Sequence, residues 1–335
     1  GKTICVTAPA VAEITCSRKI TTRIFVQPYN ALAQHQLFAI RNLVERFKVK
    51  VAMCCGNQIG ERNFPDFLSD ENNLPSILIM TIDTFSKMVR FYKEKFQRWC
   101  NAKIVSKIIV DEAHLVYTEK SFRDSFTVLK TLAQFGVPLL LLSGSLPNAL
   151  VLPLLRWMNL TDDRSASEVH TIFDDNLVGD FIDFNVHFIQ NPVDCAVRQI
   201  REMMGEAGSV HVVCSNLEEV KRVCDGVKNY ERSVASLTSA DLREDKREVT
   251  AKWFQGHLRV LVSTTCALAG VESSNLRKLV LVGHVYSLLN LLQFRGRLRP
   301  SNLAKGGVEM AVYLSPRRVK VEDSDQILWG SLLGD

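Results

Sequence analysis

The sequence has no apolar run long enough to cross a bilayer. The stretch at 137–142 is short, and the apolar stretch after Leu279 is interrupted by His284. A membrane-spanning helix needs about 18 or more consecutive apolar residues. We therefore expect no membrane-embedded segment here and no membrane among the partners of the chain.

The sequence also has little of what a disulfide or zinc framework requires. Its nine cysteines are odd in number and scattered, mostly within apolar segments. The adjacent pair Cys54 and Cys55 lacks the two-residue gap of a zinc knuckle. This pattern predicts small reduced core residues and a reducing, intracellular compartment.

The excess of positive over negative charge is also small. The net charge is +5, and a division near residue 178 gives 21 basic and 17 acidic residues before it and 20 and 19 after it. The excess is thus +4 in the first part and +1 in the second. Such a mild bias permits a polyanionic partner without requiring one.

What the sequence does have is a repeated alternation of strand-like and helix-like segments. A chain of 335 residues is longer than a domain with a single hydrophobic core usually is, so we expect two domains. The alternation of strands and helices is typical of parallel, doubly wound α/β sheets. Between 160 and about 179 the sequence shows no regular spacing of apolar residues, which indicates a domain junction. We therefore predict one domain at 1–178 and another at 179–335. The predicted strands are 22–27, 49–54, 76–80, 104–110, 137–142, 209–214, 258–263 and 278–282, and the predicted helices include 85–95, one capped by Ser215–Glu218, and 241–254.

Two adjacent carboxylates follow one of these apolar runs, in the stretch K-I-I-V-D-E-A-H at 107–114. A buried strand should end at the carboxyl edge of its sheet, where open α/β folds bind ligands. We expect Asp111 to hold Mg²⁺ and Glu112 to orient and deprotonate an attacking water. The alternative is an ordinary acidic cap at the start of a helix.

Two further stretches fit a phosphate site. Gly1-Lys2-Thr3 matches the end of a P-loop, in which Lys2 would reach the phosphates of a nucleotide and Thr3 would bind Mg²⁺. Ser143-Gly144-Ser145 forms a turn of small residues after the run at 137–142. By itself the tripeptide at 1–3 is also consistent with an arbitrary terminus.

Taken in order, these stretches resemble the superfamily 2 helicases, and among them most closely the RecQ-like DNA helicases. The sequence at 283–293 resembles that of the fungal telomere-linked RecQ-like group. The resemblance covers nearly the whole chain and implies two RecA-like domains, each a mainly parallel sheet flanked by helices, with the nucleotide site in the cleft between them. The stretches that carry it are 1–3 (motif I), 27–36 (motif Ia), 111–114 (motif II), 143–145 (motif III), 263–272 (motif V) and 293–299 (motif VI).

The resemblance implies roles for single residues, with ATP and Mg²⁺ as cofactors. The implied nucleotide ligands are Gly1, Lys2, Thr3, Asp111, His114 and Arg299, and of these Thr3 and Asp111 would also bind the metal. The implied catalytic residues are Glu112, Gln293 and Arg297, since arginines from a second domain can meet charge on the γ-phosphate. The implied contacts to a DNA backbone, independent of sequence, are Gln34, Thr264 and Gly270.

Several departures from the family pattern leave three functions open. Arg299 and Pro300 replace the last glycine and arginine of motif VI, and Leu268 replaces a motif V glycine. Because the chain opens inside motif I, we expect a fragment that binds ATP poorly. The functions are a nuclear, ATP-driven DNA helicase working from 3′ to 5′, a non-hydrolysing nucleic-acid-binding relative, and an RNA-directed ATPase.

Overall fold

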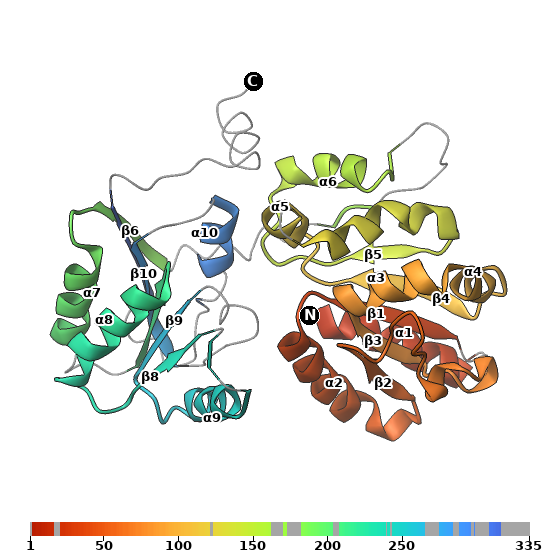
Figure 1. Ribbon diagram of the computed structural model, residues 1–335, viewed down its shortest axis with the longest axis horizontal. Coiled ribbons are helices and arrows are strands. Elements are labelled where there is room, and N and C mark those ends of the chain that lie inside the picture. The colour runs from red at the N-terminus through yellow and green to blue at the C-terminus, as the bar shows by residue number, and fades with distance from the viewer. Residues whose placement is uncertain are drawn as a thin grey trace. The chain divides into compact units, whose positions relative to one another are not determined.

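The computed structural model contains two compact units, Gly1–Val169 and His170–Asp335, which are described separately (Figure 1). It describes residues 2–16, 21–120, 123–161, 170–172, 182–203, 208–238, 240–241, 243–264, 275–283, 288–295, 298 and 308–315. The boundary predicted at residue 178 lies outside these ranges. In the part of the chain so described, no helix is both long and apolar enough to cross a membrane.

The first unit is built on a five-stranded sheet in the order β2-β3-β1-β4-β5, in which every recorded pairing is parallel. The sheet follows from short β-branched and aliphatic runs, whose side chains point alternately to the two faces. Its strands are β1 (Thr22–Gln27), β2 (Val51–Cys54), β3 (Ile77–Thr81), β4 (Val105–Val110) and β5 (Leu139–Leu141).

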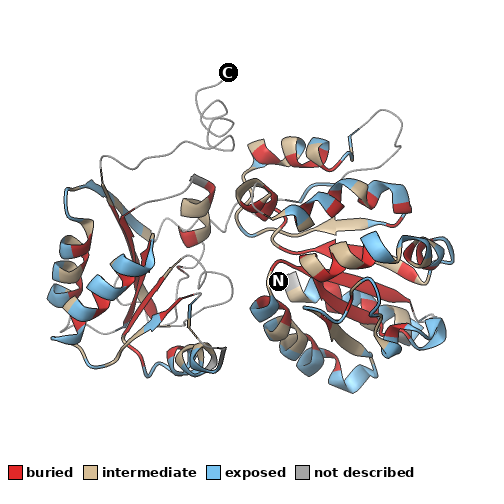
Figure 2. Cartoon of the chain, viewed as in Figure 1, coloured by how far each residue is buried: buried red, intermediate tan, exposed pale blue. Residues whose placement is uncertain are grey.

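Helices cover both faces of this sheet (Figure 1). Phe25 of β1 packs on the side of α1 and α2, whereas its neighbours Ile24 and Val26 join the larger core on the opposite side. β1 and β3 are therefore buried on both faces, as Figure 2 shows in red, whereas β2 and β5 at the sides of the sheet are mostly half-buried. The helical segments are α1 (Lys2–Cys16), α2 (Asn30–Val44), η1 (Glu45–Phe47), η2 (Asp66–Leu68), η3 (Glu71–Asn73), α3 (Ile82–Phe91), α4 (Lys93–Asn101), α5 (Leu115–Glu119), η4 (Asp124–Phe135), η5 (Asn148–Leu150) and α6 (Val151–Trp157).

The second unit has a six-stranded sheet in the order β6-β11-β10-β7-β9-β8, again with parallel pairings throughout. One face packs on α7 and α8 and the other on α9 and α10. The strands are β6 (Ile182–Phe188), β7 (Ser209–Cys214), β8 (Val234–Leu237), β9 (Val260–Thr264), β10 (Leu276–Gly283) and β11 (Val308–Leu314), and the helices are α7 (Pro192–Glu202), α8 (Leu217–Lys228), α9 (Arg243–Phe254) and α10 (Leu288–Arg295).

The predicted fold class, two parallel α/β domains flanked by helices, is confirmed. Two local predictions are wrong. The helix predicted at 85–95 is two helices, because Tyr92 leaves helical geometry between α3 and α4 and donates its hydroxyl to Gly60 O at 2.9 Å. The cap of α8 is Asn216 and not Ser215: the Asn216 side chain accepts the amide of Glu219, and the Glu219 carboxylate accepts the amide of Ser215.

The cysteines only partly follow the prediction of core residues. Cys54, Cys100, Cys214 and Cys224 are buried, whereas Cys5 and Cys16 on α1 are exposed. Burial raises the pKa of Cys54 and of Cys100 to about 12, so these thiols stay protonated at neutral pH. They act as small apolar residues in the larger core of the first unit.

Candidate functional site

The acid pair of motif II lies in the turn that follows β4, at the carboxyl edge of the first sheet. The turn is fixed by the neighbouring strands, because the Asp111 amide donates to Val26 O of β1 at 2.9 Å. On the other side, the Ala113 amide donates to Leu142 O, just beyond β5, at 3.0 Å. The structure thus places Asp111 and Glu112 after a largely buried strand at the carboxyl edge of the sheet, whereas ligand binding at this edge remains a prediction.

Asp111 is buried, with 4% of its surface exposed, and both carboxylate oxygens have partners. Oδ1 accepts the amide of Glu112 at 3.0 Å, and Oδ2 accepts Nε2 of Gln27 at 3.2 Å. The alternative of a helix cap is not realised, because the N-cap of α5 is His114 and no side chain caps that helix. Asp111 is instead a buried carboxylate whose Oδ2 accepts the neutral side-chain amide of Gln27.

Gln27 is a site residue that the sequence analysis did not single out. It ends β1 beside the turn after β4, its side chain is fully buried, and its Oε1 has no hydrogen-bond partner. A buried amide oxygen without a partner costs free energy unless a ligand or water meets it. The available signal was its place as the last residue of a buried strand, which is polar where the preceding positions are apolar.

Glu112 adopts a left-handed backbone conformation, with φ of 50°. A residue with a β-carbon is disfavoured there by about 1 kcal/mol or more, so the surrounding turn must impose the conformation. Its side chain is 21% exposed, and Oε2 lies 3.4 Å from Nδ1 of His114. The strained backbone therefore keeps the carboxylate of Glu112 at the surface of the site while that of Asp111 stays buried.

His114 joins motif II to the Ser143-Gly144-Ser145 turn. Its ring is almost completely buried; Nδ1 lies 2.7 Å from Oγ of Ser143, and Nε2 lies 3.4 Å from Oγ of Ser145. Ser143 Oγ also accepts the amide of Ser145 at 3.2 Å. The two turns that sequence analysis placed at the same sheet edge are thus connected through one imidazole.

A second polar network adjoins this site and was missed from the sequence. Arg123 donates from Nη2 to Asp83 Oδ2 and to Pro28 O, both at 2.6 Å, and from Nη1 to Glu119 Oε2 at 2.8 Å. Tyr29 donates its hydroxyl to the other oxygen of Glu119. One guanidinium therefore connects the turns that follow β1 and β3 with the end of α5.

The charges of this network shift two pKa values. Burial alone would raise the pKa of Asp83, but hydrogen bonds from Arg123 and Ser125 outweigh it, so that the pKa lies below its ordinary value. For Glu119 burial dominates and raises the pKa, although Arg123 offsets part of the effect. The hydrogen bonds and charge of Arg123 therefore help to outweigh the effect of burial on the pKa at Asp83 but do not outweigh it at Glu119.

The remaining predicted residues lie in both units, and some of them are outside the described ranges. Thr3 lies on α1 and donates its hydroxyl to Oε1 of Gln36 at 3.2 Å, and Gln34 is half-buried on α2. Thr264 ends β9 and Gln293 lies on α10, each half-buried. Lys2 begins α1, but its side chain is outside the description, as are Gly1, Gly270, Arg297 and Arg299 entirely. The roles assigned to all these residues remain predictions.

The residues present fit a magnesium-bound nucleotide. A carboxylate and a hydroxyl, Asp111 and Thr3, are the hard oxygen ligands that Mg²⁺ prefers, and the unpartnered Gln27 oxygen marks a polar position beside Asp111. Among the described residues no group of three or more His, Cys, Asp or Glu could hold a metal. Mg²⁺ at phosphates needs only one or two carboxylates, because phosphate and water supply the other ligands.

The two parallel α/β sheets flanked by helices match the RecA-like domains of solved helicase structures. Residues 1–151 match the family described as DEAD/DEAH box helicase, and residues 194–300 match the helicase conserved C-terminal domain. The chain thus carries the N-terminal and C-terminal domains of a superfamily 2 helicase. No curated protein sequence matches the chain.

Solved structures with the same fold include helicases bound to DNA and to RNA. The helicase MrfA, bound to DNA and AMPPNP, is 16% identical, with a TM-score of 0.71 over 94% of this chain and 45% of that one. The Mycobacterium smegmatis helicase Lhr, bound to single-stranded DNA and AMP-PNP, is 18% identical, with a TM-score of 0.65 over 100% of this chain and 45% of that one. The DEAD-box helicase Mss116, bound to single-stranded RNA and UDP-BeF, is 16% identical, with a TM-score of 0.69 over 100% and 72%.

The chain spans 45% of the length of MrfA and of Lhr. At these identities the likeness shows the fold alone. Neither the family matches nor these structures distinguish a RecQ-like helicase from other members of superfamily 2.

Proposed function

We propose that this chain is the motor core of an ATP-dependent DNA helicase or translocase of RecQ type, which moves from 3′ to 5′ and acts in the nucleus. The observation that carries the proposal is the cluster at the carboxyl edge of the first sheet. There a buried Asp111, a surface Glu112 and the His114–Ser143 contact lie in adjoining turns. The similarity of the motif sequences to those of RecQ-like helicases supports DNA as the nucleic acid.

The residues divide the work of hydrolysis between them. Asp111 and Thr3 would hold Mg²⁺, which when bound neutralises charge on the phosphates of ATP. Glu112 orients a water and accepts its proton on the carboxylate, for which its surface position is suited. His114 positions the turn of Glu112 against the turn of Ser143, so that a shift in one turn changes the other.

Contacts to nucleic acid are proposed at residues of both units. Gln34 on α2, Thr264 at the end of β9 and Gly270 would bind the phosphate backbone, which carries no sequence information. The Arg123 network would support them, because it fixes the turns that follow β1 and β3. Binding of this kind tolerates any sequence and weakens with salt.

The test is the ATPase activity of the full natural protein that contains this chain, with and without single-stranded DNA, beside the variant Glu112→Gln. We expect stimulation by DNA, and a loss of at least about 100-fold in turnover in the variant, because removing a general base costs about that much or more. Binding of a fluorescent ATP analogue should change little, since Glu112 acts on water and not on the phosphates.

The controls separate the competing functions. Glu61→Gln, a change of the same kind at an exposed loop position, should leave turnover unaltered. Stimulation by RNA but not by DNA would replace the proposal with an RNA-directed ATPase. ATPase activity that survives Glu112→Gln would refute the assignment of the general base, and absence of hydrolysis in the unaltered protein would favour a non-hydrolysing relative.

A further inference from the structure

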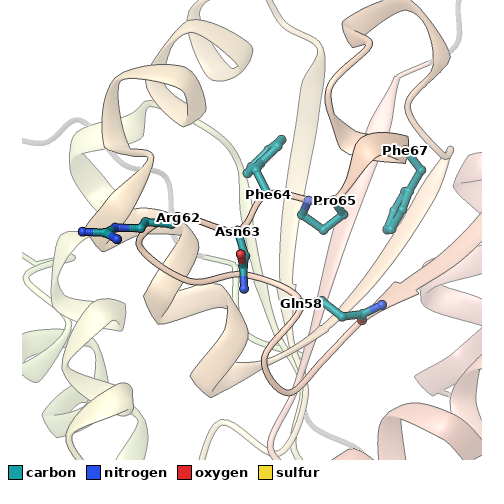
Figure 3. Close-up of a pocket in the computed structure, with 6 residues that line it drawn as sticks. All are labelled: Gln58, Arg62, Asn63, Phe64, Pro65 and Phe67. Carbon is teal, nitrogen blue, oxygen red and sulfur yellow. The ribbon is translucent and has the colours of Figure 1, made fainter.

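We propose that the loop between β2 and η2 carries a pocket for one unstacked nucleobase of the bound strand. The inference rests on the proposed function, since it names a contact of the same motor with its nucleic acid. The pocket has a volume of about 350 Å³ and is lined by Gln58, Arg62, Asn63, Phe64, Pro65 and Phe67 (Figure 3). This volume is at the lower end of the range of about 300–1,000 Å³ typical of small-molecule sites.

The loop that forms the pocket is anchored and not a loose surface segment. Ile59 within the loop and Leu68 at the end of η2 are completely buried. Gly60 and Asn63 exchange backbone hydrogen bonds of 3.0 and 3.3 Å, and the hydroxyl of Tyr92 donates to Gly60 O. The walls of the pocket are therefore in place before a ligand arrives, which lowers the entropic cost of binding.

Aromatic packing fixes one side of the pocket and leaves another ring available. The Phe64 ring lies 4.6 Å from that of Tyr92 and 6.3 Å from that of Trp99, and Lys95 Nζ lies 4.2 Å from its centroid. Phe67, by contrast, is 39% exposed. Phe64 is thus held in the core of the loop, whereas the face of Phe67 is free to stack on a ligand.

The polar side chains of the pocket have unused hydrogen-bonding capacity. Within the part of the chain that the structure describes, the side chains of Arg62 and Asn63 make no hydrogen bond or ion pair. Gln58 uses only Oε1, which accepts the amide of Cys55 at 2.7 Å. Figure 3 shows Gln58 and Phe67 on one side of the opening and Asn63 on the other, with Arg62 extending away from it.

This set of groups matches a base attached to its phosphate. An aromatic face stacks on any base, two amides can bond the edge of a base, and a guanidinium reaches a neighbouring phosphate. The lining contains no carboxylate. An acidic lining would repel a nucleic-acid strand, so its absence from these six residues agrees with the proposed ligand.

The loop that forms the pocket starts at the carboxyl edge of the first sheet. The loop begins directly after Cys54, the last residue of β2, and β2 runs parallel to β3. Lys87 of α3 donates to Gly56 O at 3.4 Å and to Asn57 Oδ1 at 3.1 Å, and α3 itself starts where β3 ends. From this edge, the later residues of the loop continue along α3 to Tyr92 and Trp99, against which Phe64 packs.

The test compares two strands of equal length and phosphate number, one with bases and one abasic. Affinities are measured by fluorescence anisotropy on the full natural protein at one fixed salt concentration. Phe67→Ala should weaken binding of the strand with bases by about 5- to 150-fold, the range expected for loss of one stacked base. It should leave the affinity for the abasic strand unchanged, because phosphate contacts remain.

Phe47→Ala is the matched control. Phe47 is 42% exposed, similar to Phe67, but it lies in η1 before the start of β2, and therefore near the opposite edge of the sheet. It should change the affinity for neither strand. Asn63→Ala is a second test variant, since its side chain has no bond to lose in the fold; we expect a loss of a few-fold, confined to the strand with bases.

The outcomes separate this inference from the proposed function. If the unaltered protein binds neither strand, both are overturned. If it binds strands but Phe67→Ala has no effect, or weakens both strands equally, the pocket is not a base site while nucleic-acid binding stands. RNA and DNA versions of the strand with bases show which of the two supplies the base, and a folded Phe67→Ala protein is verified by its thermal melting.

Discussion

The two units bury charged side chains in the same way near the amino ends of their strands but differ at the carboxyl ends. In the first unit Arg23 of β1 pairs with Glu13 of α1, and in the second Lys278 of β10 pairs with Glu309 of β11 at 2.7 Å. At the carboxyl edge of the first unit, Asp111 contacts Gln27 of β1, and His114 contacts the turn at 143–145. Arg123 contacts three other segments through Pro28, Asp83 and Glu119.

In the second unit, the described contacts at the carboxyl edge join the turn after β7 to β10 and to the start of α8, and Ser215 Oγ donates to Val282 O at 3.1 Å. There Glu219 accepts the amide of Ser215, and its carboxylate lies against Gly283, whose φ is 92°. The buried polar contact of His211 with Ser263, at 2.8 Å, lies inside β7 and β9 and not in the turns after them. We infer from this comparison that the ion pairs near the amino ends of the strands stabilise the fold. The polar network that joins turns of the first unit lies at the edge where we propose the chemistry.

The largest effect on stability should come from breaking the ion pair inside the second sheet. Lys278 is 2% exposed, so Lys278→Ala leaves a cavity and an unpaired Glu309, and we expect the free energy of unfolding to fall by about 3 kcal/mol. The double variant Lys278→Met with Glu309→Leu removes both charges and should recover most of this loss, as replacement of a buried pair by apolar residues often does. Urea denaturation measures both, and equal destabilisation by the two would contradict the role of the pair.

An intermediate effect is expected at Gly283. A β-carbon built there would lie 2.6 Å from both carboxylate oxygens of Glu219, and the backbone conformation is one that other residues avoid. Gly283→Ala should therefore lower the free energy of unfolding by about 2 kcal/mol. Gly60→Ala is the control, because nothing lies within 4 Å of the added carbon and φ is not positive there; it should change stability by no more than about 0.5 kcal/mol. A similar loss in both variants would mean that the contact with Glu219 is irrelevant.

The smallest effect is a pH dependence in the Arg123 network. The pKa of Asp83 lies below its ordinary value of 3.8, so the ionised side chain stabilises the fold above that pH, and this stabilisation is lost as the pH falls through the lowered pKa. Glu119 has the opposite sign: its raised pKa means that stability is greatest below about its ordinary value of 4.5 and is lost as the pH rises through the raised value.

The measurement is the difference in unfolding free energy between the unaltered protein and Asp83→Asn at pH 5 and at pH 3. We expect the advantage of the unaltered protein to shrink at pH 3, and only modestly, because the Asp83 side chain is 49% exposed and solvent screens its charge. A difference that stays constant between the two pH values would show that Asp83 contributes no ionisation-linked stability.

Much of the fold could be predicted from local sequence. β1 and β7 were predicted with the observed bounds, because each is an apolar or β-branched run whose neighbours are polar or turn-forming. The strand predicted at 137–142 is shorter, since β5 extends only from Leu139 to Leu141. β6 was missed although Ile182, Phe184, Val186 and Phe188 alternate with polar residues, the pattern of a half-buried strand. The structure leaves Phe184, Val186 and Phe188 exposed.

The candidate site was predictable where it depends on one segment and not where it depends on several. The position of Asp111 and Glu112 follows from the strand that precedes them. The Gln27–Asp111 and His114–Ser143 contacts require β1, β4 and β5 to be neighbours, which is a property of strand order and not of spacing in the sequence. The Arg123–Asp83 pair bridges 40 residues and has no local signature.

The left-handed backbone of Glu112 has a consequence for the evolution of this protein in the laboratory. Glycine is the residue that adopts such a φ without a steric penalty, so Glu112→Gly would relieve strain at the same position where it removes the carboxylate. A selection for heat resistance alone would therefore favour glycine at 112 and discard the proposed chemistry. Engineers who stabilise this chain must hold that one position fixed and seek their gains elsewhere.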